Sequence, residues 1–190
     1  MKATFALLAN WEIHNLVRKL SWEIHRKYRT GTRHASLPPH ISLKQPFNIR
    51  NLDPLEKYMD ELASSIDPFD VTLTELQIEP LVYEGIEYGI LWIDILQTET
   101  LRQLHARVNS ELEQRFGNTA ADHDGIEYHF HMTVTLGGQP IATYRQFLSE
   151  VAEPRIHLSY TVRELGMFVY DEPMGPNGEY LSYRTLPVGL

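Results

Sequence analysis

Two short stretches, His40-Ile41-Ser42-Leu43 and His131-Met132-Thr133-Val134, decide how this chain is expected to fold. Each contains an imidazole, a spacer, a hydroxyl and an apolar residue, and each opens a segment with the character of a strand, HISLKQPF and HMTVTLGG. Side chains two positions apart in a strand point to the same face. Each stretch is therefore predicted to hold one imidazole and one hydroxyl side by side.

The surroundings of the two motifs repeat along the chain. The order strand, helix, motif strand, helix, strand occurs twice with a period of about 87 residues, which is too long for a solenoid. This repeat predicts two α+β lobes related by a pseudo-twofold, one over about 3–86 and one over about 87–172, with a closing strand at about 179–187. The two motif strands are then expected to meet near the axis, across one cleft.

Local signals support these elements. Asn10 is a candidate cap for a helix that runs to about Arg29, and Thr98 or Thr100 for a helix that ends at Gly117. Asn51 or Asp53 is the candidate cap of a further helix, which Asp67-Pro68 breaks. Apolar side chains at helical spacing mark all of these segments and a fourth helix around Tyr144–Val151.

Composition and charge limit the function. The chain has 190 residues, 43% of them hydrophobic, no cysteine and a net charge of −8, which argues against broad binding to nucleic-acid backbone. The segment from Arg18 to Arg50 nevertheless has eight basic residues and one acid, so it carries +7 and the rest of the chain −15. It contains the first motif, and is interpreted either as a local field that attracts an anion or as a solvated helix face. Without a signal peptide or an apolar run long enough to span a bilayer, we expect a cytoplasmic, monomeric protein that needs no membrane.

The paired motifs suit chemistry at a phosphodiester. Cleavage of a P–O bond needs a base, an acid and donors to the non-bridging oxygens. His40 and His131 can divide the acid and base roles near neutral pH without a metal or other cofactor, and Ser42 and Thr133 can donate to the phosphate. Lys44 follows Ser42 by two, so it is either a further phosphate contact or a solvated edge residue, and Thr135 has the matching place in the second motif.

The two patterns resemble the two-histidine (2H) phosphoesterase superfamily, whose signature is a pair of His-x-Thr/Ser-hydrophobic motifs, and HISLKQPF is similar to the branch of 2′-5′ RNA ligase-like proteins. The resemblance covers about residues 3–186. It implies a bilobal α+β fold of antiparallel sheets facing a central cleft, and metal-independent hydrolysis of 2′,3′-cyclic phosphates to 2′-phosphates. It also implies His131 as the base toward water and His40 as the acid, although the pseudo-symmetry leaves these roles interchangeable.

The chain departs from the ligase pattern after the second motif, where Leu136-Gly137-Gly138 stands in place of a basic residue that is common in that branch. A small cyclic nucleotide or an RNA end is therefore the expected partner, and RNA joining is not favoured. Three aromatic residues at repeat-equivalent strand ends are interpreted as core residues or as stacking partners for a base: Tyr83, Phe168 and Tyr170.

Two alternatives remain open. Five possible metal ligands lie within ten positions: Asp122, His123, Asp124, His129 and His131. The first lobe has no matching cluster, which favours the metal-free interpretation. The second alternative is a binding module that holds a nucleotide or RNA end in the same cleft without turnover.

Overall fold

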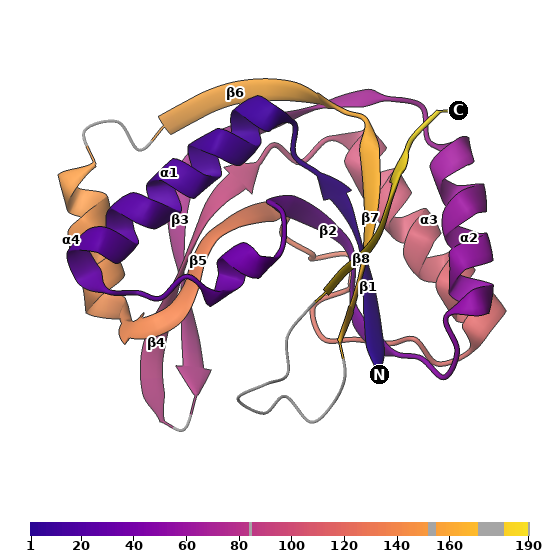
Figure 1. The fold of residues 1–190 in the computed structure, drawn as a ribbon, viewed down its shortest axis with the longest axis horizontal. Helices are drawn as coiled ribbons and strands as arrows, with labels where there is room; N and C mark the ends of the chain where they lie inside the picture. The colour runs from indigo at the N-terminus through magenta and orange to yellow at the C-terminus, as the bar shows by residue number, and fades with distance from the viewer. Residues whose placement is uncertain (84, 152–154, 171–180, 190) are drawn as a thin grey trace.

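The structure is a computed structural model that describes residues 1–83, 85–151, 155–170 and 181–189. Two curled antiparallel sheets lie beside one another in it, with helices at both outer ends (Figure 1). The α+β class and the two antiparallel sheets agree with the sequence prediction. Among the helices described, none is long and apolar enough to cross a membrane.

The first and third helices begin at predicted capping residues, while the fourth begins at Ile141, three residues before the predicted Tyr144. Asn10 caps α1 by accepting from the Ile13 N–H at 2.9 Å, and Thr98 caps α3 by accepting from the Leu101 N–H at 3.3 Å. The second helix differs, because its N-cap is Leu52, with no side-chain bond at that position. The helices are α1 (Trp11–Tyr28), α2 (Asp53–Ser65), α3 (Glu99–Phe116) and α4 (Ile141–Glu150), and a short 3-10 turn, η1 (Arg33–Ser36), precedes the first motif.

The strands form two sheets of four. The first has the order β2-β1-β7-β8 and the second the order β5-β4-β3-β6, with every neighbouring pair antiparallel. The motif strands β2 and β5 are therefore both at a sheet edge. The strands are β1 (Lys2–Leu8), β2 (His40–Asn48), β3 (Phe69–Tyr83), β4 (Ile86–Ile95), β5 (His131–Pro140), β6 (Arg155–Val162), β7 (Glu164–Tyr170) and β8 (Leu181–Pro187).

The sheets do not follow the contiguous lobe boundaries predicted from the repeat. β3 lies in the second sheet, paired with β4 and β6, while β7 returns to the first sheet beside β1. Two helices also pack against the sheet of the other half. Helix α1 packs against β5 of the second sheet, and α3 packs against β2 of the first. The physical reason is the β3–β4 hairpin, whose ladder continues to its turn and keeps both strands in one sheet. The two halves are thus intertwined, so 3–86 and 87–172 are not separate lobes.

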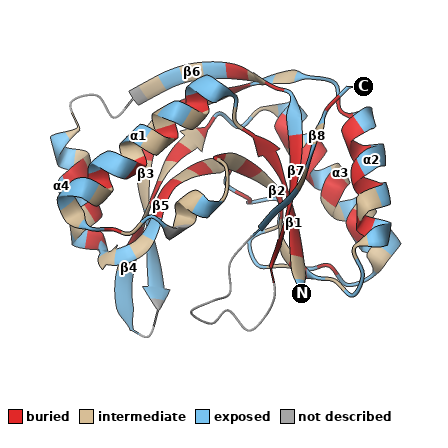
Figure 2. Cartoon of the chain, in the orientation of Figure 1, coloured by how far each residue is buried: buried red, intermediate tan, exposed pale blue. Residues whose placement is uncertain are grey.

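A shared apolar core holds the halves together. Fully buried side chains come from both sheets and from the inward faces of all four helices, and Figure 2 shows them concentrated in the strands and on the helix faces turned toward them. Burial of apolar surface on this scale is the dominant favourable term in folding. The core places the first residues of β2 and β5 on rigid elements.

Candidate active site

Each motif histidine is held by the backbone two residues before it. The Nδ1 of His40 lies 2.8 Å from the Pro38 carbonyl oxygen, and the Nδ1 of His131 lies 2.8 Å from the His129 carbonyl oxygen. A carbonyl only accepts, so both Nδ1 atoms carry the proton. The Nε2 atom of each ring is therefore left for chemistry, as an acceptor when the ring is neutral and as a donor when it is charged.

The two imidazoles belong to one site. β2 and β5 are the edge strands that lie against each other between the sheets, and both rings are half-buried. A positive charge on His131 lowers the pKa of His40, which is an electrostatic sign of their proximity. The structure thus brings together two histidines that are ninety-one positions apart in the sequence.

His40 lies in apolar surroundings. Its ring contacts Phe168 in a T-shaped arrangement, with ring centroids 4.8 Å apart and an interplanar angle of 72°. Burial is the largest cause that lowers its pKa to about 4, and the charges of His131 and Arg18 add to it, against the Pro38 carbonyl. His40 is consequently neutral over most of the physiological range.

His131 has a more polar neighbourhood. Its ring stacks on the Trp92 indole at 4.2 Å and 20°, and Trp92 Nε1 donates to Asp94 Oδ1 at 2.8 Å. His129 Nε2 lies 2.9 Å from the same oxygen. Burial lowers the pKa of His131 most and the charge of His129 lowers it further, while the His129 carbonyl and, as the smallest effect, the Asp94 carboxylate raise it. His131 therefore keeps its proton more readily than a ring in purely apolar surroundings.

This asymmetry arises at repeat-equivalent positions. In the first sheet Leu8 is paired with His40 and Ala6 with Ser42; in the second, Asp94 is paired with His131 and Trp92 with Thr133. The paired positions on β1 and β4 are 86 residues apart in both cases, close to the period of about 87 residues in the sequence. The two halves thus share a motif geometry and differ in the cross-strand partner of each histidine.

The hydroxyls lie where the alternation of a strand predicts. Ser42 and Thr133 are both half-buried like the histidines, with a buried apolar residue between hydroxyl and ring. Each motif strand then bulges after the hydroxyl, because Ser42 and Lys44 face adjacent residues of β1 and Thr133 and Thr135 face adjacent residues of β4. The side chains at Lys44 and Thr135 are consequently turned inward.

The structure corrects the expectation for Lys44. Its side chain is only 2% exposed, and its ammonium donates to Asn109 Oδ1 at 2.9 Å and pairs with Asp124. The bulge breaks the regular alternation that would have put Lys44 on the Ser42 face. Lys44 is neither a solvated edge residue nor next to the motif hydroxyls.

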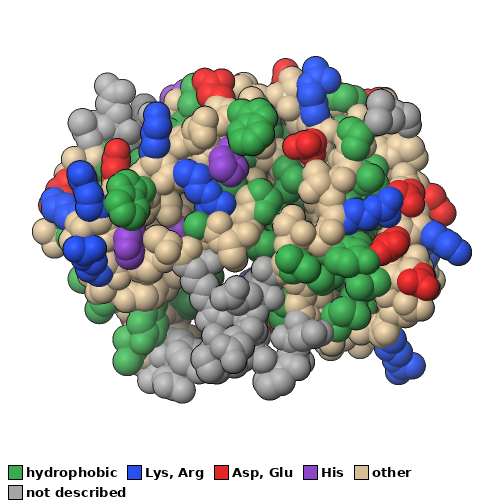
Figure 3. All heavy atoms as spheres, viewed as in Figure 1, with side chains coloured by type: hydrophobic (Ala, Val, Ile, Leu, Met, Phe, Trp, Pro, Cys, Tyr) green, Lys and Arg blue, Asp and Glu red, His purple; other side chains and the backbone are tan. Residues whose placement is uncertain are grey.

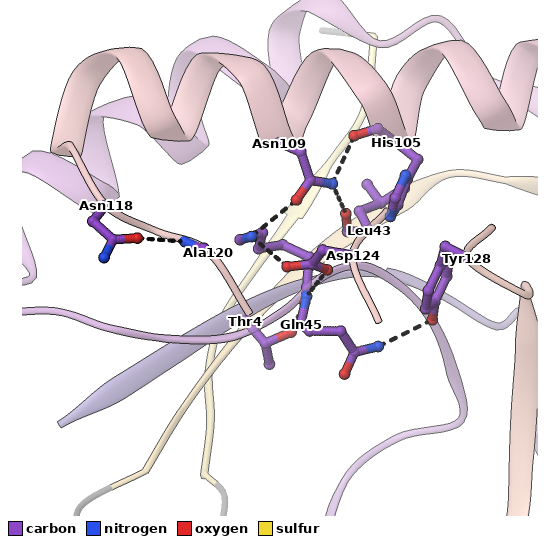
Figure 4. Close-up of polar contacts among 10 residues, drawn as sticks. Thr4, Leu43, Gln45, His105, Asn109, Asn118, Ala120, Asp124 and Tyr128 are labelled. Atoms are coloured by element: carbon purple, nitrogen blue, oxygen red, sulfur yellow. Dashed lines mark hydrogen bonds and ion pairs between the residues drawn. The ribbon is translucent and has the colours of Figure 1, made fainter. Parts of the chain in front are cut away.

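Asp124 ties the loop before β5 to β2. Besides Lys44, its carboxylate accepts from the Gln45 N–H at 2.8 Å, and the Gln45 amide donates to the Tyr128 hydroxyl at 3.3 Å (Figure 4). Tyr128 also hydrogen-bonds with Ser42, and burial, the largest cause, raises its pKa to about 12. Tyr128 therefore stays a neutral phenol that links the loop to the Ser42 hydroxyl.

Several site residues were missed by the sequence analysis. Tyr128 lies 6.3 Å from His131, ring centroid to ring centroid, and Arg18 donates to the carbonyl oxygens of Ala35 and Leu37 just before the first motif. Trp92 and Asp94 share a strand face across from the second motif, so a predicted β4–β5 register would have found them. Arg18 and Tyr128 have no comparable signal, because tertiary packing alone brings them in.

The aromatic candidates occupy different places. Phe168 is fully buried against His40, and Tyr170 is buried near Lys2, whose ammonium lies 5.8 Å from its ring centroid. Neither offers an open face to a base. The Tyr83 side chain lies outside the described residues.

The possible metal ligands do not converge. Within the described residues, no group of three or more His, Cys, Asp or Glu side chains could hold a metal ion. Asp124 is committed to Lys44 and the Gln45 N–H, and His129 to Asp94. The donor set thus does not fit the alternative of a metal centre at 122–131.

Known proteins share the sequence and the fold. The model of the 2′-5′ RNA ligase superfamily matches residues 11–173. A protein of Geobacillus sp. (strain WCH70), provisionally named a phosphoesterase, is 24% identical over 164 residues, covering 85% of this chain and 84% of its own. A similarly named protein of Geobacillus thermodenitrificans (strain NG80-2) is 26% identical with the same coverage.

Solved structures agree on the fold. A crystal structure of a Thermus thermophilus protein superposes with a TM-score of 0.69 at 15% identity, covering 100% of this chain and 98% of that one. E. coli LigT complexed with 3′-AMP superposes with a TM-score of 0.57 at 18% identity and the same coverage. From the family match over most of its length, the chain belongs to the 2′-5′ RNA ligase superfamily and is an enzyme of the phosphoesterase class.

Proposed function

We propose that the protein hydrolyses 2′,3′-cyclic phosphates of nucleotides or RNA ends to 2′-phosphates, with His40 and His131 as its acid–base pair. The observation that carries this proposal is the matched anchoring of both rings, which leaves both Nε2 atoms free on facing edge strands. LigT, to which the fold is similar, has been solved with 3′-AMP, ATP and NADP⁺, and this supports a nucleotide ligand.

The four motif side chains account for both proton transfers and for the charge that develops on the phosphate. A neutral imidazole takes a proton from water as the water oxygen bonds to phosphorus, and the P–O3′ bond breaks. The charged imidazole gives its proton to O3′, so the products are a 2′-phosphate and a free 3′-hydroxyl. Ser42 and Thr133 donate to the non-bridging oxygens, where negative charge accumulates. No metal is needed to move either proton.

The surroundings favour His40 as the base and His131 as the acid. A base has to begin neutral, and the pKa of His40 is about 4. An acid has to begin charged, and the Asp94 carboxylate opposes the loss of the proton from His131. This assignment is the reverse of the one implied by the family resemblance.

The test is to incubate the purified protein with 2′,3′-cyclic nucleotides in EDTA and to separate 2′- from 3′-monophosphates. The proposal expects the 2′-product, and a loss of several orders of magnitude in rate for His40→Ala and for His131→Ala. His157→Asn, at an exposed position of β6, is the matched control. Turnover that EDTA abolishes would refute the metal-free mechanism, and binding without conversion would favour the binding-module alternative.

A further inference from the structure

Helix α1 carries two exposed tryptophans on one face. Trp11 is 81% exposed and Trp22 57% exposed. Eleven residues separate them, so at 100° per residue they lie within about 20° of each other around the helix and about 16 Å apart along it. Arg18, seven residues after Trp11, lies between them within about 20° of Trp11 around the helix. Figure 3 shows hydrophobic, histidine and basic side chains next to one another over α1. We call this surface the α1 face, defined by Trp11, Arg18 and Trp22.

The indoles are not needed for the core. The side of α1 that packs inward consists of Ile13, Val17, Ser21 and Ile24. Each indole is instead flanked by a histidine one turn on, Trp11 by His14 and Trp22 by His25, in both cases with ring centroids 5.8 Å apart. The histidine contacts limit the orientations of the two indole rings, which stay exposed to solvent. Exposed aromatic rings of this kind are available for stacking on the bases of a nucleic acid.

The α1 face begins at the catalytic site. Leu8, the last residue of β1, is the cross-strand partner of His40, and the Ala9 N–H donates to the Pro39 carbonyl at 3.0 Å. Trp11 follows directly at the start of α1. Arg18 donates to the Ala35 and Leu37 carbonyl oxygens, and its charge is felt by His40. A chain that reaches from the catalytic histidines along α1 therefore passes Trp11, Arg18 and Trp22.

The charge of this region selects a polyanion. Helix α1 has four basic residues and two acids, so it carries +2 while the rest of the chain carries −10, and its Lys19 and Arg26 are exposed. A phosphate backbone is therefore attracted to α1 more than to the rest of the chain. Single-stranded nucleic acids bind to surfaces that combine such charge with aromatic rings on which bases stack.

We propose that the α1 face binds the nucleotides that precede the cyclic phosphate of an RNA end, with bases stacked on Trp11 and Trp22. A separation of about 16 Å corresponds to about five nucleotides, given a stacked rise of about 3.4 Å. The inference rests on the proposed hydrolysis of cyclic phosphates and deepens it, because it makes a short RNA end a better substrate than a mononucleotide.

The experiment compares kcat/KM for a six-nucleotide RNA ending in a 2′,3′-cyclic phosphate with kcat/KM for 2′,3′-cyclic AMP. In Trp11→Ala and Trp22→Ala, the ratio of hexamer to mononucleotide is expected to fall about tenfold or more, since each removes one stacking partner. Trp22→Phe, which keeps a ring, is expected to retain most of the ratio. Ile86→Ala removes an exposed apolar side chain from the β3–β4 hairpin and is the matched control.

An unchanged ratio in both Trp→Ala variants would overturn the inference while leaving the proposed hydrolysis intact. If the wild type converts neither substrate, the proposed hydrolysis fails, and the α1 face is tested by titration of a labelled hexamer with a 3′-phosphate. Weaker binding by Trp22→Ala than by Ile86→Ala then supports the inference. Equal binding, or none by the wild type, refutes it.

Discussion

The ring of His131 lies flat on the indole of Trp92, with ring centroids 4.2 Å apart. The same indole donates to Asp94 Oδ1, which also pairs with His129. In the other half the positions equivalent to Trp92 and Asp94 are Ala6 and Leu8, and His40 instead contacts Phe168 of β7 in a T-shaped arrangement. Two identical residues on equivalent strands thus have unequal proton affinities, which a base and an acid require.

The pH profile follows from the two shifts. If His40 is the base, kcat/KM rises with pH through about 4, the pKa at which this ring becomes neutral. If His131 is the acid, kcat/KM falls again before 6.5, because the pKa of this ring is lowered from that value. We expect a bell-shaped profile of kcat/KM for cyclic AMP with its maximum on the acidic side of 6.5. An optimum above that pH would contradict the assignment.

Asp94→Asn separates the two roles. Loss of the carboxylate lowers the pKa of His131. If His131 is the acid, its pKa sets the falling limb of the profile, on the high-pH side, and this limb is expected to move to lower pH. Asp70→Asn, which changes a carboxylate that accepts from Thr161 on the same sheet, is the control. If the rising limb on the low-pH side moves instead, His131 is the base.

The motif hydroxyls are tested by Ser42→Ala and Thr133→Val. Each variant removes one donor to the charge that develops on the phosphate, and we expect kcat to fall about 10²-fold in each. Thr133→Ser, which keeps the hydroxyl, should recover most of the rate. Thr161→Val on β6 is a control for loss of a threonine hydroxyl away from the site. Near-normal kcat in both donor variants would exclude Ser42 and Thr133 from phosphate stabilisation.

Lys44 is predicted to stabilise the folded protein. Lys44→Met leaves the Asp124 carboxylate without its buried partner, which is expected to lower the free energy of unfolding by about 3–5 kcal/mol in a urea titration. Arg115→Met breaks the more exposed pair with Glu61 and should cost about 1 kcal/mol or less. A similar small loss for both variants would show that the Lys44–Asp124 pair contributes little.

Much of the fold follows from local rules. The caps at Asn10 and Thr98, the stop at Gly117 and the two motif strands are properties of short segments, because a side-chain oxygen or a glycine acts on backbone groups a few residues away. The match between the two motifs likewise needs only spacing and repetition. These features were predicted from the residues themselves.

The amino-acid sequence by itself was enough to predict the α+β class, the caps at Asn10 and Thr98, and two strands that begin at His40 and His131. Only the tertiary structure decided that β3 and β7 change sheets, that Lys44 turns inward to Asp124, and that Trp92 and Asp94 lie beside His131. The physical reason is that strand pairing and bulges set the register between distant segments. A shift of one residue in that register moves a side chain to the opposite face.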